Sequence, residues 1–250
     1  MIKVELMSIM IVKNRLLDLD LCIYQNDDWF KFSLDSVLLS QFVTINLRTK
    51  KVLDLACGNA PIPMFLTYRT KAMIYGVEYQ KCIYDLALKS IIENHLESKI
   101  KLYNEDIRNL RNVFESDSFD VITCNPPYFK VHDTLFLNEN DVKANARHEV
   151  NLKLDDVLNS ASYLLKNGGI FAMVHRTERL VEILDAFRKY SIEPKRVQFI
   201  YPKMGKNSDL FLIEGIKNGH VGLNMLPPLV VHEDSGDYTD ELQKYLSFDN

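Results

Sequence analysis

The stretch Lys51-Val-Leu-Asp-Leu-Ala-Cys-Gly-Asn-Ala-Pro-Ile-Pro63 passes from an apolar run through a glycine to a second apolar run. The first run is typical of a buried strand, and the second, which continues through Phe65, predicts a helix. A glycine at the carboxyl end of a first parallel strand lets a ligand approach the backbone closely. That edge of an open α/β sheet is also where ligands generally bind. The stretch therefore predicts a class of fold and the edge of the sheet at which a site lies.

The alternation of strand and helix continues after this stretch. Further strands are expected at residues 72–77, 100–103, 119–124 and 170–174, with helices at 82–95, 152–165 and 177–190. Gly168-Gly169 is expected to end the helix at 152–165. Such alternation predicts a mostly parallel sheet covered on both faces. The last two strands, near 197–201 and 210–215, are joined only by a loop, so one of them is expected to run antiparallel.

Residues 1–48 and the C-terminal tail depart from this alternation. A hairpin is expected around Gln25-Asn-Asp-Asp28, followed by a helix from about Asp35 to Phe42. The tail from Pro227 contains adjacent prolines and several acids. We therefore expect an extension at each end of a central α/β domain.

Composition restricts the class of protein. The chain has 250 residues and a net charge of −4, which does not indicate a strongly basic nucleic-acid binder. Basic residues nevertheless slightly outnumber acidic ones over 125–206, and this local excess permits a polyanionic partner. No apolar run approaches the roughly 20 residues that span a bilayer, and charged residues interrupt the N-terminal segment, so neither a membrane span nor a signal peptide is expected. The spacing of the histidines is not that of metal ligands, so no metal is expected. The cysteines are widely separated in sequence, which favours a reducing cytoplasm; they are Cys22, Cys57, Cys82 and Cys124.

Acidic residues follow three successive predicted strands. Asp54 ends the first, Glu78 ends the second, and Asp106 comes just after the third. In such places Glu78 can accept the hydroxyls of a ribose, and Asp106 can accept from an adenine amine while Ile107 packs on the ring. A single glycine beside Asp54, in place of G-x-G-x-x-G, disfavours pyrophosphate and favours a sulfonium or ammonium group. Each acid alone is more often a surface or helix-capping residue, but together they predict a nucleoside site for a cationic, phosphate-free ligand.

The stretch Thr123-Cys-Asn-Pro-Pro-Tyr-Phe-Lys130 follows the predicted strand at 119–124 with two residues that donate no backbone hydrogen bond. A planar amine is a poor nucleophile because its lone pair is delocalised into the ring. The side-chain carbonyl of Asn125 and the backbone carbonyl of Pro126 can accept from both N–H bonds and expose that lone pair. Tyr128 offers a ring on which the target base can stack. The alternative is a tight Pro-Pro turn with an ordinary aromatic, and the acids upstream favour the site.

In this order and spacing, DLACGNAP, GVE, NEDI and NPPYF resemble the class I S-adenosylmethionine-dependent methyltransferases that modify amino groups. The resemblance implies a Rossmann-like α/β fold: a mostly parallel seven-stranded sheet with a C-terminal antiparallel strand, plus a small N-terminal hairpin–helix extension. It implies an extension at 1–48 closing over the cofactor, a methyltransferase domain at 49–221 and a tail at 222–250 packed on or near it. The implied cofactor is S-adenosyl-L-methionine, which becomes S-adenosyl-L-homocysteine. Its implied contacts are Phe32, Asp35, Asp54, Ala56, Gly58, Glu78, Tyr79, Asp106, Ile107 and Asn125, and the implied catalytic residues are Asn125, Pro126, Pro127 and Tyr128.

Other patterns are similar to those of bacterial tRNA adenine-N6 methyltransferases, which modify an adenine just 3′ of the anticodon in a valine tRNA. The stretch at 30–39, FKFSLDSVLL, resembles their motif that closes over the methionine end of the cofactor, and residues 146–149, 205–214 and 228–239 also resemble this subgroup. The loop Gly58-Asn-Ala-Pro61 departs from the pattern, since many relatives carry further glycines there, and a stiffer loop is expected. The resemblance implies a cytoplasmic, monomeric enzyme that binds tRNA through Tyr128, Phe129, Lys130, Arg147, Lys203 and Lys206.

Other acceptors and one other class of protein are alternatives. NPPY also occurs in enzymes that methylate a protein glutamine amide or a DNA adenine, and a related motif for rRNA guanine more often has Phe in place of Tyr128. No target-recognition domain for DNA is evident, and the N-terminal segment is short for a glutamine methyltransferase. A non-catalytic nucleotide-binding module would carry NPPY as a buried turn, but such a module needs no pair of amine acceptors.

Overall fold

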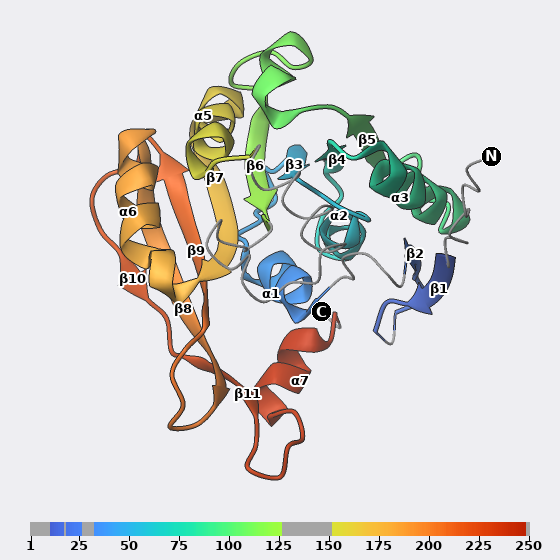
Figure 1. Cartoon of the computed structure of the whole chain (residues 1–250). Helices are drawn as coiled ribbons and strands as arrows, with labels where there is room; N and C mark the ends of the chain where they lie inside the picture. Colours follow the sequence, from blue (N-terminus) through green and yellow to red (C-terminus); the bar gives the residue numbers. More distant parts are fainter. Residues whose placement is uncertain (1–10, 18, 27–32, 127–151, 249–250) are drawn as a thin grey trace, which may run out of the picture.

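The computed structural model describes residues 11–17, 19–26, 33–126 and 152–248, and a single large sheet is central to it (Figure 1). The strand order in this nine-stranded sheet is β10-β8-β9-β7-β6-β3-β4-β5, and β11 also pairs with β8. The strands are β3 (Lys51–Leu55), β4 (Met73–Glu78), β5 (Ile100–Asn104), β6 (Phe119–Cys124), β7 (Leu165–Arg176), β8 (Ile192–Lys203), β9 (Leu210–Lys217), β10 (Asn224–Met225) and β11 (Leu229–His232).

The pairing within the sheet confirms the predicted α/β fold. Strands β3 to β7 run parallel to one another, whereas β9 is antiparallel to both β7 and β8. The short strands β10 and β11 run parallel to β8 and add to the seven that were expected. A separate antiparallel hairpin precedes the sheet, formed by β1 (Ile11–Arg15) and β2 (Cys22–Asn26).

Helices cover both faces of the sheet. Two separate clusters of buried side chains lie on its two faces. Figure 1 shows α5 and α6 on one side and α1 and α7 on the other. Their bounds, with those of the remaining helices, are α1 (Leu34–Phe42), α2 (Pro61–Leu66), α3 (Lys81–Glu93), η1 (Ile107–Asn112), α5 (Leu154–Leu164), η3 (Thr177–Arg179), α6 (Leu180–Lys189) and α7 (Asp240–Leu246).

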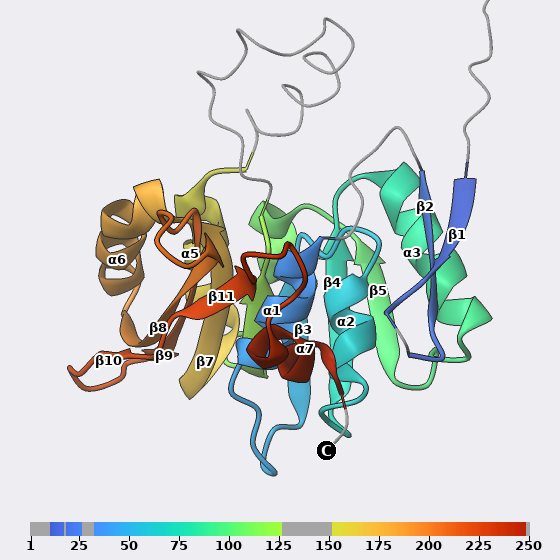
Figure 2. The same cartoon turned by 90° about the horizontal axis from the view of Figure 1, so that it is seen from below.

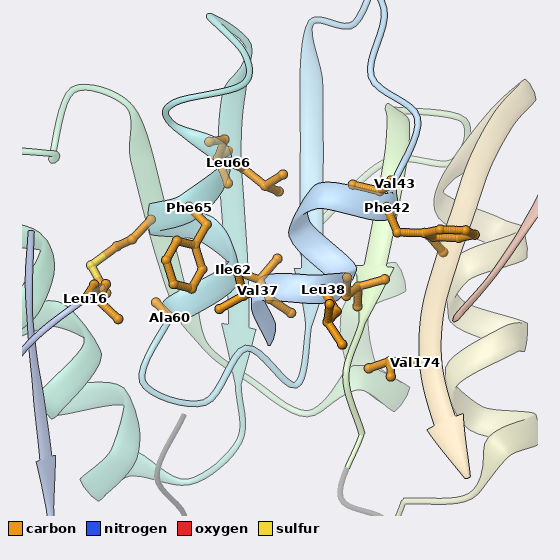
Figure 3. Close-up of a cluster of buried hydrophobic side chains, with 14 of the residues drawn as sticks. Leu16, Val37, Leu38, Phe42, Val43, Ala60, Ile62, Phe65, Leu66 and Val174 are labelled. Atoms are coloured by element: carbon orange, nitrogen blue, oxygen red, sulfur yellow. The ribbon is translucent and has the colours of Figure 1, made fainter. Parts of the chain in front are cut away.

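The helix of the N-terminal extension is part of the main core. Helix α1 lies beside α2 and α7 on one face of the sheet (Figure 2). Val37 and Leu38 of α1 are buried near Ile62 and Phe65 of α2 (Figure 3). Six of the nine residues of α1 are buried, including the consecutive residues 36–40, so the helix is buried on more than one face. The core therefore fixes α1 relative to the strands that carry the predicted site.

The hairpin turns at a different place from the one expected. The prediction of a turn around Gln25-Asn-Asp-Asp28 is wrong, because Gln25 and Asn26 pair within β2. The chain reverses at residues 16–21 instead, where the Leu16 N–H donates to the Leu21 carbonyl over 2.9 Å. Both leucines are buried. The position of the turn therefore follows the burial of these two apolar side chains in the core, and not the polar residues that predicted it elsewhere.

The two glycines after α5 also have a different role from the one expected. The prediction that Gly168-Gly169 ends the helix is wrong, because α5 ends at Leu164 and the glycines lie within β7. Strand β7 already pairs with β6 at Phe119↔Leu165, and the register shifts before Val121↔Ile170. A Cβ on Gly169 would lie 2.9 Å from the Lys166 carbonyl oxygen, so glycine is needed at this irregularity.

Within the described ranges, every helix is too short or too polar to cross a lipid bilayer.

Candidate active site

The carboxyl ends of four parallel strands bring the predicted acids and the asparagine to one edge of the sheet. In the register of the sheet, Asp54 of β3 pairs with Gly76 of β4 and with Thr123 of β6. Glu78 ends β4 opposite Asn104, the last residue of β5. Parallel strands place their carboxyl ends together, so residues far apart in sequence meet there.

Asp54 is buried beneath this edge. The Thr123 hydroxyl donates to Asp54 Oδ1 over 2.6 Å, while Oδ2 has no hydrogen-bond partner among the described residues. Burial, with a smaller contribution from the charge of Glu78, raises the pKa of Asp54 to about 8. An unpartnered, buried carboxyl oxygen is costly unless a donor or a cation meets it. Asp54 therefore favours a positively charged ligand at this position.

The glycine loop exposes its backbone beside Glu78. Gly58 has a φ of +56°, and a Cβ built on it would meet nothing within 4 Å. Its N–H donates to Glu78 Oε2 over 3.0 Å, and the Gln80 N–H donates to Oε1 over 2.8 Å. Burial raises the pKa of Glu78, and these N–H donors oppose the shift. Each carboxylate oxygen has a second lone pair with which it can accept a ribose hydroxyl.

Two further details of this loop are its backbone angles and its contact with the N-terminal hairpin. Ala56 and Ala60 have φ values of 54° and 64°, the left-handed region that glycine adopts most easily. The Asn59 side-chain amide donates to the Tyr24 carbonyl of β2 over 2.7 Å. The loop is thus tied to the N-terminal hairpin by a side chain that glycine could not supply.

Asp106, which follows β5, has different hydrogen-bond partners from those of Glu78. Asp106 caps η1 by accepting from the Arg108 N–H over 2.9 Å, and it also pairs with the Arg108 guanidinium. This pairing lowers the pKa of Asp106. The helix-capping role is therefore present, and an adenine amine would have to share the carboxylate with Arg108. Ile107 is buried beside it, whereas Tyr79 is exposed.

Asn125 and Pro126 directly follow β6 and are half-buried. The Asn125 side-chain Nδ2 donates to Ser36 Oγ over 3.2 Å. Asp35 lies next to that serine in the first turn of α1. The remaining predicted residues of this part of the site lie outside the described residues: Phe32, Pro127, Tyr128, Phe129, Lys130 and Arg147.

The two predicted lysines of β8 and its loop reach the same edge. Since β8 and β7 are both antiparallel to β9, the carboxyl end of β8 lies with that of β7. Lys203 ends β8 and is half-buried, and Lys206 is exposed in the following loop. A hydrogen bond of 2.7 Å from the Thr177 hydroxyl to the Ser208 carbonyl ties this loop to the end of β7.

Two groups of residues at this edge were not predicted from sequence. Arg176 is exposed where β7 ends, and Arg179 contacts the buried His175, whose pKa burial lowers to about 4. Their position after a predicted strand was an available signal. Ser36 carried no such signal, because nothing local in the sequence relates it to Asn125. The described residues contain no cluster of His, Cys, Asp or Glu arranged to hold a metal ion.

Comparisons with known proteins agree with this geometry. The family model described as methyltransferase domain matches residues 47–208. The tRNA1(Val) (adenine(37)-N6)-methyltransferase of Photobacterium profundum is 25% identical over 83% of this chain and 85% of that protein. The protein of the same name from Flavobacterium psychrophilum is 24% identical over 88% of this chain and 92% of its own length.

Solved structures show the same fold. Protein Atu636 of Agrobacterium tumefaciens, a predicted O-methyltransferase, matches with a TM-score of 0.69 and 21% identity over 85% of this chain and 95% of that one. A putative S-adenosylmethionine-dependent methyltransferase from Listeria monocytogenes matches with a TM-score of 0.53 and 11% identity over 74% and 99%. The chain therefore belongs to the methyltransferase domain family and has the Rossmann-like fold of S-adenosylmethionine-dependent methyltransferases.

Proposed function

We propose that this chain is an S-adenosylmethionine-dependent methyltransferase of the cytoplasm that methylates the N6 amine of an adenine in tRNA, next to the anticodon of a valine tRNA. The observation that carries the proposal is the position of Asn125 and Pro126, which directly follow β6 at the edge of the sheet where β3 and β4 end with their acids. The relatives named as tRNA1(Val) (adenine(37)-N6)-methyltransferases support the acceptor, since they align over most of this chain.

The described residues fit a cationic nucleoside cofactor. Asp54 offers a buried, unpartnered carboxyl oxygen, Gly58 leaves open space beside its backbone, and Glu78 can accept from ribose hydroxyls. When bound, S-adenosylmethionine would supply an electrophilic methyl group on a sulfonium centre. Residues 1–48, including Asp35 in α1, would close over its methionine end, while 49–221 form the methyltransferase domain and 222–250 the tail.

The acceptor amine would be held at the end of β6. Asn125 Oδ1 and the Pro126 carbonyl would accept from the two N6 hydrogens, which draws the nitrogen toward a geometry with an exposed lone pair. Tyr128 would stack on the base, with Pro127 fixing the chain between them. The alkylated amine is acidic, so its proton can leave to water without a strong base. Lys203 and Lys206, together with Phe129, Lys130 and Arg147, would contact the RNA around the base.

The acceptor can be identified directly. The protein is incubated with S-adenosylmethionine labelled in the methyl group and with total tRNA, rRNA, DNA or a glutamine-containing protein acceptor. We expect label in tRNA, recovered as N6-methyladenosine by nucleoside analysis. Label only in DNA, rRNA or protein would contradict tRNA as the acceptor, and no label in any of them would contradict the enzyme.

Asn125→Ala tests the assigned chemistry. We expect kcat to fall by at least about 100-fold, because one of two groups that orient the amine is lost. The dissociation constant for S-adenosylmethionine, measured by calorimetry, should change little. Asn159→Ala removes an exposed asparagine on α5 and should leave both values unchanged. A parallel loss of turnover and cofactor binding in Asn125→Ala would contradict the role.

A further inference from the structure

Three side chains from other elements bind one edge of strand β2 in the N-terminal hairpin. Asn94, which caps α3, accepts from the Cys22 N–H over 2.9 Å and donates to the Cys22 carbonyl over 2.7 Å. Ser90 of α3 accepts from the Tyr24 N–H over 2.9 Å. The Tyr24 carbonyl accepts from Asn59 over 2.7 Å. Alternate residues of a strand point their backbone groups to the same edge, so all four groups face away from β1.

Asn59 lies within the glycine loop at residues 56–60, and its side chain is buried. Three residues of this loop have left-handed backbone, with φ values of 54° at Ala56, 56° at Gly58 and 64° at Ala60. The Cβ of any residue except glycine disfavours this conformation. Two of the three positions are alanines, so local preference does not supply the conformation of the loop. A contact from outside the loop is needed to hold it.

The conformation of this loop decides where the Gly58 backbone lies relative to Glu78. The Gly58 N–H donates to Glu78 Oε2 over 3.0 Å. The Cys57 N–H donates to the Val77 carbonyl of β4, and the Ala60 N–H donates to the Cys57 carbonyl, both over 2.9 Å. The open space beside Gly58 and the carboxylate that can accept ribose hydroxyls therefore depend on one loop conformation.

We propose that the N-terminal hairpin is a positioning element for the cofactor, and that Asn59 is the residue through which it acts. The amide of Asn59, bonded to the Tyr24 carbonyl, keeps the loop in the conformation that places Gly58 beside Glu78. This inference rests on the proposed cofactor but not on the acceptor. Without the bond, the loop populates other conformations, and the apparent affinity falls with the fraction of protein that can bind.

The hairpin is fixed firmly enough for this role. Strand β2 lies beside α3 (Figure 2). Ile23 is fully buried in the core, and the Lys89 ammonium lies over the Tyr24 ring, 3.9 Å from its centroid. Ser90 is also fully buried, and its hydroxyl donates to the Leu86 carbonyl over 2.9 Å, so its oxygen is held toward β2. The position of the Tyr24 carbonyl is therefore set by α3 and the core, and the loop adapts to it.

Four single variants and one double variant separate this coupling from local effects. Asn59→Ala removes the side-chain amide, and Asn59→Asp keeps its size but removes the donor. Asn94→Ala loosens the hairpin without changing the loop. The double variant Asn59→Ala/Asn94→Ala shows whether the two residues act through the same bond. Asn167→Ala is the matched control, because its exposed amide accepts from Asn218 over 3.2 Å near the amino end of β7.

The measurements are the dissociation constant for S-adenosylhomocysteine by calorimetry, the melting temperature, and hydrogen exchange of the Gly58 N–H without ligand. We expect the dissociation constant to rise about fivefold in both Asn59 variants, as for loss of one neutral hydrogen bond. In Asn94→Ala it should rise about threefold, since core burial still holds the hairpin. The double variant should match Asn59→Ala, and Asn167→Ala should stay within about twofold of the wild type. Exchange at Gly58 should be faster in the variants that lose affinity.

Wild-type affinity in both folded Asn59 variants would overturn the inference and leave the proposed function standing. Wild-type affinity in Asn94→Ala alone, or additive losses in the double variant, would overturn the role of the hairpin, because the two residues would then act separately. A loss in Asn167→Ala equal to that in Asn59→Ala would also overturn it. Wild-type protein that binds no S-adenosylhomocysteine would overturn the proposed cofactor together with this inference.

Discussion

At the scale of single residues, Asp54 has the least ordinary environment among the predicted site residues. The prediction that a carboxylate here attracts a cation was made from its place after a strand. The structure adds that the group is fully buried, that Thr123 satisfies only one of its oxygens, and that its pKa is about 8. Below that pH the ligand-free protein holds the proton, because burial disfavours the charged form.

Cofactor binding should therefore release a proton at neutral pH. A sulfonium or ammonium group near Asp54 favours the carboxylate and lowers its pKa, so the proton leaves on binding. Affinity for S-adenosylmethionine should rise as pH increases toward about 8 and level off above it. Calorimetry at pH values below and above this point, in two buffers of different ionisation enthalpy, measures the proton release. Asp54→Asn should show none, and a pH-independent affinity in the wild type would contradict this linkage.

At the scale of elements, a buried polar cluster fixes α1 to the sheet. Glu214 of β9 is 4% exposed and accepts from Thr44, just after α1, and from Arg196 of β8 over 2.8 Å. The Arg196 guanidinium also lies over the Phe42 ring, 4.7 Å from its centroid. Each polar group in the cluster has a partner, which is the condition for burying charge without a large penalty. Helix α1 carries Asp35 and the Ser36 that contacts Asn125, so this cluster also holds these two residues in place beside the end of β6.

Removing the acid at the centre of this cluster should be strongly destabilising. Glu214→Ala leaves the Thr44 N–H and the Arg196 guanidinium without their acceptor, at a cost of about 3 kcal/mol. Asp85→Ala is the control, since Asp85 pairs with Lys81 on the surface of α3 and its loss should cost less than about 1 kcal/mol. Urea unfolding measures both free energies. Equal costs for the two variants would contradict the structural role of Glu214.

At the scale of the whole molecule, the C-terminal tail and the N-terminal helix belong to one core. Strand β11 pairs with β8, and α7 packs on α1. Leu242 of α7 is fully buried, and the Phe248 ring stacks on Phe65 of α2 with centroids 5.2 Å apart. The C-terminal tail therefore stabilises α1 and α2 on one face of the sheet, and cooperative unfolding is expected.

Truncating the buried leucine of the tail tests this cooperativity. Leu242→Ala should lower the free energy of unfolding by about 3 kcal/mol, because a buried side chain leaves a cavity. Unfolding should remain a single transition by both fluorescence and circular dichroism. Leu47→Ala, at a fully exposed leucine, should change the free energy by no more than about 0.5 kcal/mol. A separate early transition, with the main one unchanged, would show that the tail unfolds independently.

The sequence alone was sufficient to predict those features that depend on short stretches of chain. The strand–glycine–helix pattern at 51–63 and the acids after successive strands predicted the sheet and the edge where Asp54, Glu78 and Asn125 meet. Such motifs are contiguous, and parallel strand order then brings their ends together with little further choice. The same local reasoning placed the hairpin turn and the end of α5 wrongly, because core burial and strand pairing override local propensity there.

Only the tertiary structure decided how the site is supported. Ser36 meets Asn125 across 89 positions, and Thr44 meets Glu214 across 170. No pattern within α1, β6 or β9 shows these contacts, since each depends on how a helix lies across the sheet. The sequence thus determined which groups carry the proposed chemistry, and the packing of α1 decided which hydroxyl meets Asn125. Hydrogen bonds act over about 3 Å, so their partners are known only after packing has brought distant segments that close.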